Sequence, residues 1–243
     1  MRLLGDYHTH TTYTHGKSTI EENVKQAENL GLKEIAITEH SYLGYNHIRR
    51  GDLQKMRTDI ESIKDNYNVK ILLGIEANLI SLDGDIDISD EELKDLDVVV
   101  LGFHKLTKLK LSQFFKFALP NLLRKKPTKK QIERNTKAYL NAIEKHRVSI
   151  IAHLGYAGCK VDCVSIAKEC AKRNIYIEFN GKRINFSKED IEGMIKTGVK
   201  FIINSDAHHY LNVGKNHRAF NLIEKYNIPL EQVANLDNLP KFN

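Results

Sequence analysis

Short apolar runs alternate with amphipathic stretches along the whole chain of 243 residues. The apolar runs are rich in Val, Ile and Leu, which is typical of strands buried on both faces of a parallel sheet. They cover seven ranges: residues 2–7, 34–37, 70–75, 98–103, 148–152, 175–179 and 200–204. Seven strands that each precede a helical stretch predict a parallel sheet with right-handed crossovers. The pattern fits a seven-unit barrel or an open doubly wound sheet.

Capping signals mark where helices begin between these strands. The segments STIE from Ser18, SDEE from Ser89 and TKKQ from Thr128 each fit a capping box. Gly31 fits the end of the first helix. Because no linker or tandem repeat divides the chain, we expect residues 1–243 to form a single domain.

Histidine or acidic residues follow six of the seven predicted strands, and the sixth strand ends instead on Asn180, a poor metal ligand. The carboxyl ends of parallel strands meet at one end of a barrel, where barrel enzymes build their active sites. We therefore expect these side chains to converge. In chain order the candidate ligands are His8, His10, His15, His40, Glu76, His104, His153, Asp206 and His208.

The residue types in this set indicate a metal centre. His8 and His10 lie two positions apart, so in a strand both imidazoles point to the same face and can bind one ion. Imidazole and carboxylate ligands suit zinc, iron or manganese, and the lack of cysteine argues against a structural zinc site. The set exceeds the needs of one ion, and the two oxygens of Glu76 suit it to bridge. We therefore expect two or three divalent ions.

Five segments carry a resemblance to a known family: DYHTHTTYTHGKST at residues 6–19, AITEH at 36–40, GIEANLISLDGDIDIS at 74–89, GFH at 102–104 and NSDAH at 204–208. They resemble the PHP family, named for polymerase and histidinol phosphatase, and its YcdX-like stand-alone phosphoesterases most of all. The resemblance spans residues 4–235. It implies an α/β fold, a distorted (β/α)7 barrel with a trinuclear metal centre at the C-terminal ends of the strands. Zinc is the usual metal of the family, and manganese or iron occurs in relatives.

The resemblance also implies which ion each ligand binds. It gives one ion to His8, His10, Glu76 and Asp206, a second to His15, His40 and His208, and a third to Glu76, His104 and His153. Glu39 departs from the family pattern, in which Asp usually precedes the histidine, and AHLG at residues 152–155 replaces the common SHPG. Neither change removes a ligand. Asp6 either orients a ligating imidazole or is a plain strand-end acid.

A centre of this kind is expected to hydrolyse phosphomonoesters. A metal-bound hydroxide would be the nucleophile, and the cations would neutralise charge on the phosphoryl oxygens. Ser205 has no evident activating partner and is interpreted as a turn residue. Basic residues would stabilise the phosphate further, and Arg183 is preferred because its strand otherwise contributes nothing to the metal centre. The other candidates are Lys105 and Arg49, with Arg50 and Lys182 beside them.

The sequence does not choose among the substrates known in the family. Histidinol phosphate, nucleotides or oligonucleotides, and phosphotyrosine all stay open. An amidohydrolase-type hydrolase also begins with an HxH motif, but it would place a bridging Lys at the end of the fourth strand, where this chain has His104. A nucleic-acid-binding protein with purely structural metals is a third interpretation, although no recognition motif supports it.

The net charge of +6 is concentrated after the fourth strand. Residues 105–137 hold eleven of the 37 Lys and Arg but only one acid, Glu133, so the rest of the chain is net negative. Residues 105–127 form a basic insertion that is longer than a usual βα loop. It is a cap whose apolar side chains pack down, a lid or docking surface for polyanions, or a membrane-surface contact. Those apolar side chains are Phe114, Phe115, Phe117, Leu122 and Leu123.

The remaining composition indicates a cytoplasmic protein. No apolar run approaches membrane-spanning length, and the first residues lack the apolar stretch of a secretory signal. Cys159, Cys163 and Cys170 follow no zinc-site spacing and are expected to be reduced thiols. The expected partner is a phosphorylated small molecule or nucleotide, and a homo-oligomer stays open.

Overall fold

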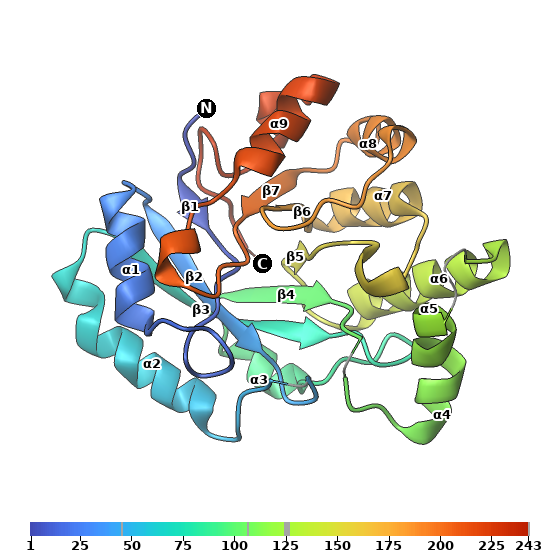
Figure 1. Cartoon of the computed structure of the whole chain (residues 1–243), viewed down its shortest axis with the longest axis horizontal. Coiled ribbons are helices and arrows are strands. Elements are labelled where there is room, and N and C mark those ends of the chain that lie inside the picture. The colour runs from blue at the N-terminus through green and yellow to red at the C-terminus, as the bar shows by residue number, and fades with distance from the viewer. Residues whose placement is uncertain (45, 106, 124–126, 243) are drawn as a thin grey trace.

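Seven parallel strands form one sheet, in the order β1 to β7 along the chain (Figure 1). The computed structural model describes residues 1–44, 46–105, 107–123 and 127–242. The sheet curls into a nearly closed barrel with helices between the strands, so the expected distorted (β/α)7 barrel is confirmed and the open sheet is excluded. The strands are β1 (Gly5–Asp6), β2 (Glu34–His40), β3 (Lys70–Asn78), β4 (Val98–Gly102), β5 (Ile150–Ile151), β6 (Tyr176–Asn180) and β7 (Phe201–Asn204).

The capping signals are largely confirmed. Ser89 and Glu92 form the expected capping box, and the Thr128 side chain accepts a hydrogen bond from the backbone of Gln131. The first box is shifted by one residue to Thr19, because the Ser18 hydroxyl instead accepts from the backbone N–H of Tyr210. The α-helices are α1 (Ile20–Asn29), α2 (Asp52–Ile63), α3 (Asp90–Lys94), α4 (Leu111–Gln113), α5 (Leu119–Leu123), α6 (Lys129–Lys145), α7 (Cys163–Arg173), α8 (Lys188–Ile195) and α9 (His217–Tyr226).

Strand lengths differ from the predicted ones at the end of the barrel that holds the candidate ligands. β2 and β3 extend further than expected because their ladder continues until His40 pairs with Glu76. β1 ends earlier because the backbone N–H of Tyr7 donates to the side-chain oxygen of Asn204 in β7 (2.9 Å) instead of to a backbone carbonyl. Both candidate ligands at the ends of β2 and β3 are therefore held by regular strand pairing.

Amide side chains join the first strand to the last. Asn235 is fully buried, and its Nδ2 donates to the carbonyl oxygens of Gly5 (2.9 Å) and Ile203 (2.7 Å). Its Oδ1 accepts from the backbone N–H of Ile203 (3.0 Å). These bonds take the place of a long β1–β7 ladder, and they bring His8, two residues beyond β1, close to the residues that follow β7.

Apolar side chains fill the amino-terminal half of the barrel. Tyr7 and Tyr176 belong to the same buried cluster there. The centre of the Phe242 ring, from the C-terminal segment, lies 5.0 Å from the centre of the Tyr7 ring and 5.8 Å from that of Tyr176. A larger apolar cluster packs between the outside of the sheet and the helices. No helix in the described part of the chain is long and apolar enough to cross a membrane.

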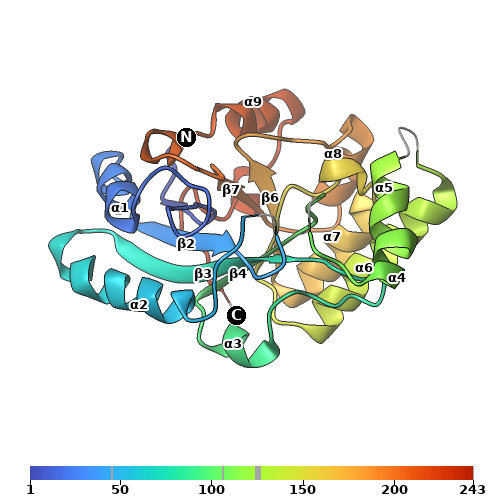
Figure 2. The same cartoon turned by 60° about the horizontal axis from the view of Figure 1, so that its bottom comes forward.

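The basic insertion begins after β4 and stands beside α6, on the opposite side of the molecule from α1 and α2 (Figures 1 and 2). Its short helices α4 and α5 flank a π-helical turn, η2 (Phe114–Ala118). Phe117 is buried, with its ring 5.1 Å from that of Phe103. Phe115 and Leu123 are 57% and 71% exposed, so a cap in which all five apolar side chains pack down is wrong. Residues 106 and 124–126 of the insertion lie outside the described residues.

Candidate metal centre

Glu76 lies at the centre of a ring of imidazoles. It is the seventh residue of β3, fully buried, and aimed into the carboxyl end of the barrel. Five histidine nitrogens surround its two oxygens: His40 Nδ1 at 2.6 Å, His153 Nε2 at 2.9 Å, His104 Nε2 at 3.2 Å, His8 Nε2 at 3.3 Å and His10 Nε2 at 3.6 Å. These side chains come from segments spread over most of the sequence, so the barrel brings them together.

The other three candidate ligands complete the cluster. Asp206 Oδ1 lies 3.6 Å from His10 Nε2. The His15 ring stacks 4.9 Å from the His40 ring and lies 4.2 Å from the ring of His208. The structure thus places all nine candidates at one site.

Three overlapping groups have ligand atoms that all lie within 4.8 Å of one another: His8, His10 and Glu76; His40, Glu76 and His104; His10, His40 and His208. They overlap with the three sets that the family resemblance implies but do not reproduce them, because His10 and His40 are each shared between two groups. The ion that each residue binds therefore stays a prediction.

Unpaired buried nitrogens test whether the cluster suits a metal. Among the described residues, His8 Nε2 and both ring nitrogens of His10 are buried without a hydrogen-bond partner. An unsatisfied buried polar group costs about 1–3 kcal/mol, and most such groups in folded proteins are paired. A divalent cation would pair the Nε2 nitrogens of His8 and His10, and imidazoles with carboxylates are the donors that zinc, iron and manganese accept. The donor set therefore fits a metal centre.

The protonation states suit the same purpose. Burial and the neighbouring His40 and His208 hold the pKa of His10 well below its usual value, and burial lowers the pKa values of His15 and His208 to about 4. Burial alone would raise the pKa of Glu76, but the surrounding imidazoles hold it well below its usual range. At neutral pH His10, His15 and His208 are thus neutral imidazoles and Glu76 is a carboxylate anion, the forms that bind metals. In contrast, Glu178 and Glu76 raise the pKa of His8 well above its usual value despite burial, and Glu76 raises the pKa of His104.

Glu178 in β6 orients His8, and the sequence interpretation missed it. Its Oε1 accepts from His8 Nδ1 (2.7 Å), which leaves Nε2 facing Glu76. Its Oε2 accepts from the backbone N–H of His153 (2.9 Å). A carboxylate behind a ligating imidazole fixes the tautomer and ring position. The available signal was an acidic residue inside the apolar segment YIEFN. The end of the sixth strand was expected to contribute nothing to the metal centre, but the strand itself supplies this positioning carboxylate.

One further residue positions an imidazole from behind: Asn78 Oδ1 accepts from His104 Nδ1 (2.6 Å) and holds His104 in place. Glu39 lies beside another imidazole, with Oε2 3.8 Å from His10 Nδ1, but makes its hydrogen bonds to Thr11 and Thr14. Burial raises the pKa of Glu39 to about 7.

Asp6 plays a different part from the one considered from the sequence. Its carboxylate accepts from the backbone N–H groups of Ser205 (3.0 Å) and Gly214 (2.9 Å), and not from an imidazole. It thereby positions the segment after β7 that carries two candidate ligands. In that segment Asp206 has φ = 53°, and His153 after β5 has φ = 31°. Left-handed backbone at residues other than glycine costs about 1–3 kcal/mol and concentrates at functional sites.

The basic candidates differ in how close they lie to the cluster. Arg183 lines the cavity of about 310 Å³ over the cluster, with its guanidinium 4.3 Å from the centre of the Tyr156 ring. Lys182 lines the same cavity, and its Nζ lies 3.0 Å from Asp206 Oδ1 and 2.6 Å from His208 Nδ1. Lys105 lines an adjoining cavity of about 450 Å³. Arg49 is exposed at the start of α2 and is absent from the described lining of both cavities.

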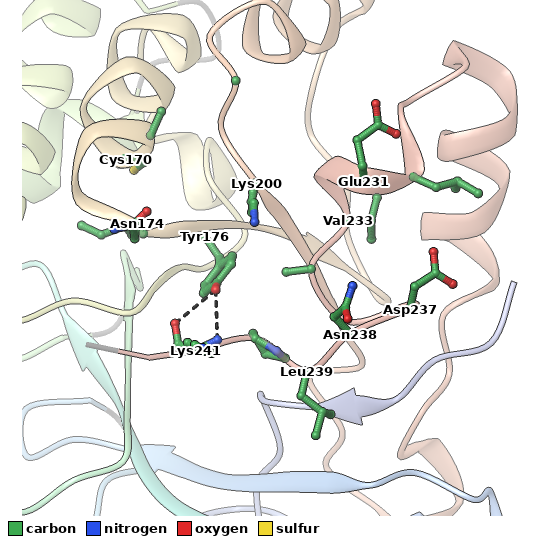
Figure 3. A pocket seen from close by; sticks show the side chains of 16 residues that line it. Cys170, Asn174, Tyr176, Lys200, Glu231, Val233, Asp237, Asn238, Leu239 and Lys241 are labelled. Carbon is green, nitrogen blue, oxygen red and sulfur yellow. Dashed lines mark hydrogen bonds between the residues drawn. The ribbon is translucent and has the colours of Figure 1, made fainter.

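A larger cavity of about 650 Å³ lies at the other end of the barrel, beside the amino ends of β6 and β7 (Figure 3). Tyr176 and Lys200 line one side, and the segment through Asp237 and Lys241 lines the other. The Tyr176 hydroxyl donates to the Lys241 carbonyl (3.1 Å) and accepts from its N–H (3.2 Å). No histidine lines this cavity, so the chemistry singles out the smaller one over Glu76.

The fold and the site together place the chain among barrel proteins that gather imidazoles and carboxylates at the carboxyl ends of their strands. Within that class the chain belongs to the PHP family, because the family model for the PHP domain matches residues 6–227.

Curated relatives are similar to the chain over nearly its whole length. The chain is 32% identical to a probable phosphatase of Caldanaerobacter subterraneus subsp. tengcongensis over 247 residues, 97% of this chain and 88% of the relative. It is 28% identical to a probable phosphatase of Clostridium acetobutylicum over 249 residues, with 98% and 92% covered.

Its fold is similar to that of histidinol phosphate phosphatase from Lactococcus lactis subsp. lactis Il1403, complexed with zinc, L-histidinol and phosphate. The TM-score is 0.64 at 18% identity, over 100% of this chain and 98% of that one. A chain of an archaeal ribonuclease P with mature tRNA shares the fold at a TM-score of 0.53 and 14% identity, over 93% and 84%.

Proposed function

We propose that the chain is a metal-dependent phosphatase that hydrolyses phosphomonoesters at the Glu76 cluster. The family and the probable phosphatases among its relatives support a phosphoric ester hydrolase. The observation that carries the proposal is the set of five imidazoles around one buried carboxylate, with the nitrogens of His8 and His10 left unpaired by the protein.

The nine clustered residues would hold two or three divalent ions, zinc first and manganese or iron as alternatives. Such ions lower the pKa of bound water and neutralise phosphoryl oxygens. The protein's own part is to bring the imidazoles together, to fix His8 through Glu178 and His104 through Asn78, and to keep these groups rigid.

Two cations are placed to stabilise the phosphate. Lys182 and Arg183 line the cavity over the cluster, and the face of Tyr156 holds the guanidinium in one orientation. Positive groups fixed in advance where negative charge develops lower the barrier for phosphoryl transfer. Lys105 is proposed as a weaker contributor from the adjoining cavity, and Arg49 is dropped.

The substrate is proposed to be a phosphorylated small molecule. Histidinol phosphate and nucleotides are the two leading choices, and the Lactococcus lactis protein of similar fold was solved with L-histidinol and phosphate. The basic insertion is proposed to attract anionic substrates toward the cavities, since it follows the carboxyl end of β4 and its Lys105 lines the cavity beside the cluster. A cytoplasmic location and a homo-oligomer stay predictions.

The test combines metal analysis with a phosphatase panel. Wild-type protein loaded with zinc, manganese or iron is assayed on histidinol phosphate, nucleoside monophosphates and phosphotyrosine beside a His8→Ala/His10→Ala variant. We expect bound metal and activity in the wild type, and loss of both in the variant. A wild type that binds metal but hydrolyses none of these esters favours the metal-stabilised binding protein.

A further inference from the structure

We propose that the 450 Å³ cavity beside the cluster is a leaving-group pocket that selects phosphomonoesters with a flat, apolar leaving group, and that Leu122 of the insertion forms its selecting wall. The proposal rests on the proposed phosphatase function and adds a substrate class to it. From here on, the 310 Å³ cavity over Glu76 is called the inner cavity and the 450 Å³ cavity the outer pocket.

The two spaces adjoin. His15, His40, His104 and Tyr156 line both of them. The inner cavity is lined by candidate metal ligands and by Lys182 and Arg183, and these two cations suit a phosphoryl group. An ester whose phosphoryl group lies there and whose bulk extends past the shared side chains enters the outer pocket with its leaving group.

The walls of the outer pocket favour ring stacking over hydrogen bonding. Leu122, Tyr156 and the imidazoles of His40 and His104 line it, and these two imidazoles stand perpendicular at 5.1 Å. Asn46 and Lys105, both exposed, are polar members of the lining. Asn78 also lines it, but its Nδ2 donates to Ser41 Oγ and Asp87 Oδ2 while its Oδ1 accepts from His104. Ring faces and an aliphatic side chain bind flat apolar groups. The Asn78 amide already makes hydrogen bonds within the protein, so it is not free to bind a polar leaving group.

A buried polar network holds the Leu122 wall in place. Its neighbour Asn121 is 3% exposed, exchanges hydrogen bonds with Asn135 (2.9 and 3.1 Å) and accepts from Gln131 Nε2 (2.7 Å). Asn135 also donates to the carbonyl oxygen of Lys160 (2.9 Å), which ties α5 and α6 to the loop after Tyr156. Buried networks of this kind specify a single arrangement of the chain.

The opposite wall is tied to the same helix. Gly158 has φ = 82°, and a Cβ there would collide with the Asn121 carbonyl oxygen, so the turn that begins at Tyr156 packs directly on α5. Leu122 and Tyr156 are thereby held at a set separation across the pocket. The insertion is thus a fixed part of the catalytic face, and its residue identities select the leaving group.

Neighbouring leucines on α5 provide a matched control. Leu122 is 37% exposed and lines the outer pocket, whereas Leu123 is 71% exposed and is absent from its lining. Each is replaced by alanine in a separate variant, so the chemical change and the helix are the same. Neither residue belongs to the metal cluster.

The assay compares 2-phenylethyl phosphate with n-propyl phosphate, whose alcohols have similar acidity, so a difference in kcat/KM reports the pocket. We expect the wild type to prefer the aromatic ester by about tenfold or more. Leu122→Ala should reduce this preference about fivefold, mainly through KM, and leave n-propyl phosphate within about twofold, while Leu123→Ala changes neither. Dissociation constants of the two matching phosphonates, measured by calorimetry on metal-loaded protein, should follow the same order.

Equal kcat/KM values and equal phosphonate affinities in the wild type overturn the pocket, as does an identical response of the two leucine variants. If the loaded protein hydrolyses no phosphomonoester at all, the proposed function fails instead. Phosphonate binding then still decides the pocket, because it requires no turnover.

Discussion

The two ends of the barrel are equally buried but opposite in how their polar groups are paired. At the amino end the Tyr7 hydroxyl donates to Glu34 (2.8 Å), and Asn235 makes its full set of bonds to the first and last strands. At the carboxyl end His8 and His10 keep ring nitrogens that no described residue pairs.

This contrast separates stability from function. Paired buried groups at the amino end stabilise the closed barrel, whereas unpaired ones at the carboxyl end each cost about 1–3 kcal/mol in the absence of a ligand. Size alone points the wrong way, because the larger cavity of about 650 Å³ lies at the amino end. Single buried oxygens without a partner, such as Gln232 Oε1, occur elsewhere among the described residues, so it is the gathering of unpaired imidazole nitrogens around Glu76, and not the volume, that identifies the active end.

Removing the metal should produce the largest effect, and only at the carboxyl end. Dialysis against a chelator is expected to abolish phosphatase activity and to lower Tm by about 10 °C, since a ligand present at 100 to 1,000 times its Kd stabilises by about 3–4 kcal/mol. Calorimetry and activity before and after readdition of zinc or manganese check this. Full activity and an unchanged Tm in chelator would break the comparison.

Two buried glutamates, one at each end, allow a matched test with the second-largest expected effect. Glu178→Gln replaces the carboxylate behind His8 with a neutral amide and should lower metal affinity about 10- to 100-fold. Glu34→Gln changes an equally buried acid that accepts from Tyr7, and should reduce stability without changing metal affinity. Competition with a chromophoric chelator measures both affinities. The same loss of metal affinity in both variants contradicts the assignment of Glu178.

The sequence predicted the ligand cluster because position at a strand end is a local feature. His40, Glu76 and His104 each follow an apolar run, and parallel strands bring such ends together whatever their separation in the chain. The residues behind the imidazoles could not be predicted in this way. Glu178 reaches His8 only because the sheet closes between β1 and β7, which leaves a single strand between β1 and β6.

The role of Asp6 and the exposure of Phe115 could not be predicted from the sequence for a similar reason. The partners of Asp6 are backbone groups of Ser205 and Gly214, close in space only once the barrel has closed. The outward-facing Phe115 shows the same limit, because amphipathic spacing does not tell which apolar side chains of a short helix meet the body of the protein.

Breaking the amino end should cost stability and leave catalysis intact. Asn235→Ala removes three buried hydrogen bonds that join β1 to β7, and should lower the free energy of unfolding by about 2 kcal/mol. Urea unfolding measures the loss, and kcat/KM at a temperature well below Tm should stay within about twofold of the wild type. A large fall in kcat/KM with unchanged stability would show that the two ends are not separable.

Exposed lysines should give the smallest difference between the ends. Lys108 and Lys110 lie in the insertion on the catalytic side, whereas Lys200 and Lys241 lie beside the amino-end cavity. The double variant Lys108→Ala/Lys110→Ala should lower kcat/KM for an anionic ester about twofold at low salt, because fewer positive charges attract the substrate. The difference should vanish near 0.5 M salt, where the Debye length falls well below about 10 Å.

Lys200→Ala/Lys241→Ala removes the same charge from the far end and should leave kcat/KM unchanged at every salt concentration. If both pairs reduce kcat/KM equally, net charge and not its location attracts the substrate, and the insertion has no special part in capture.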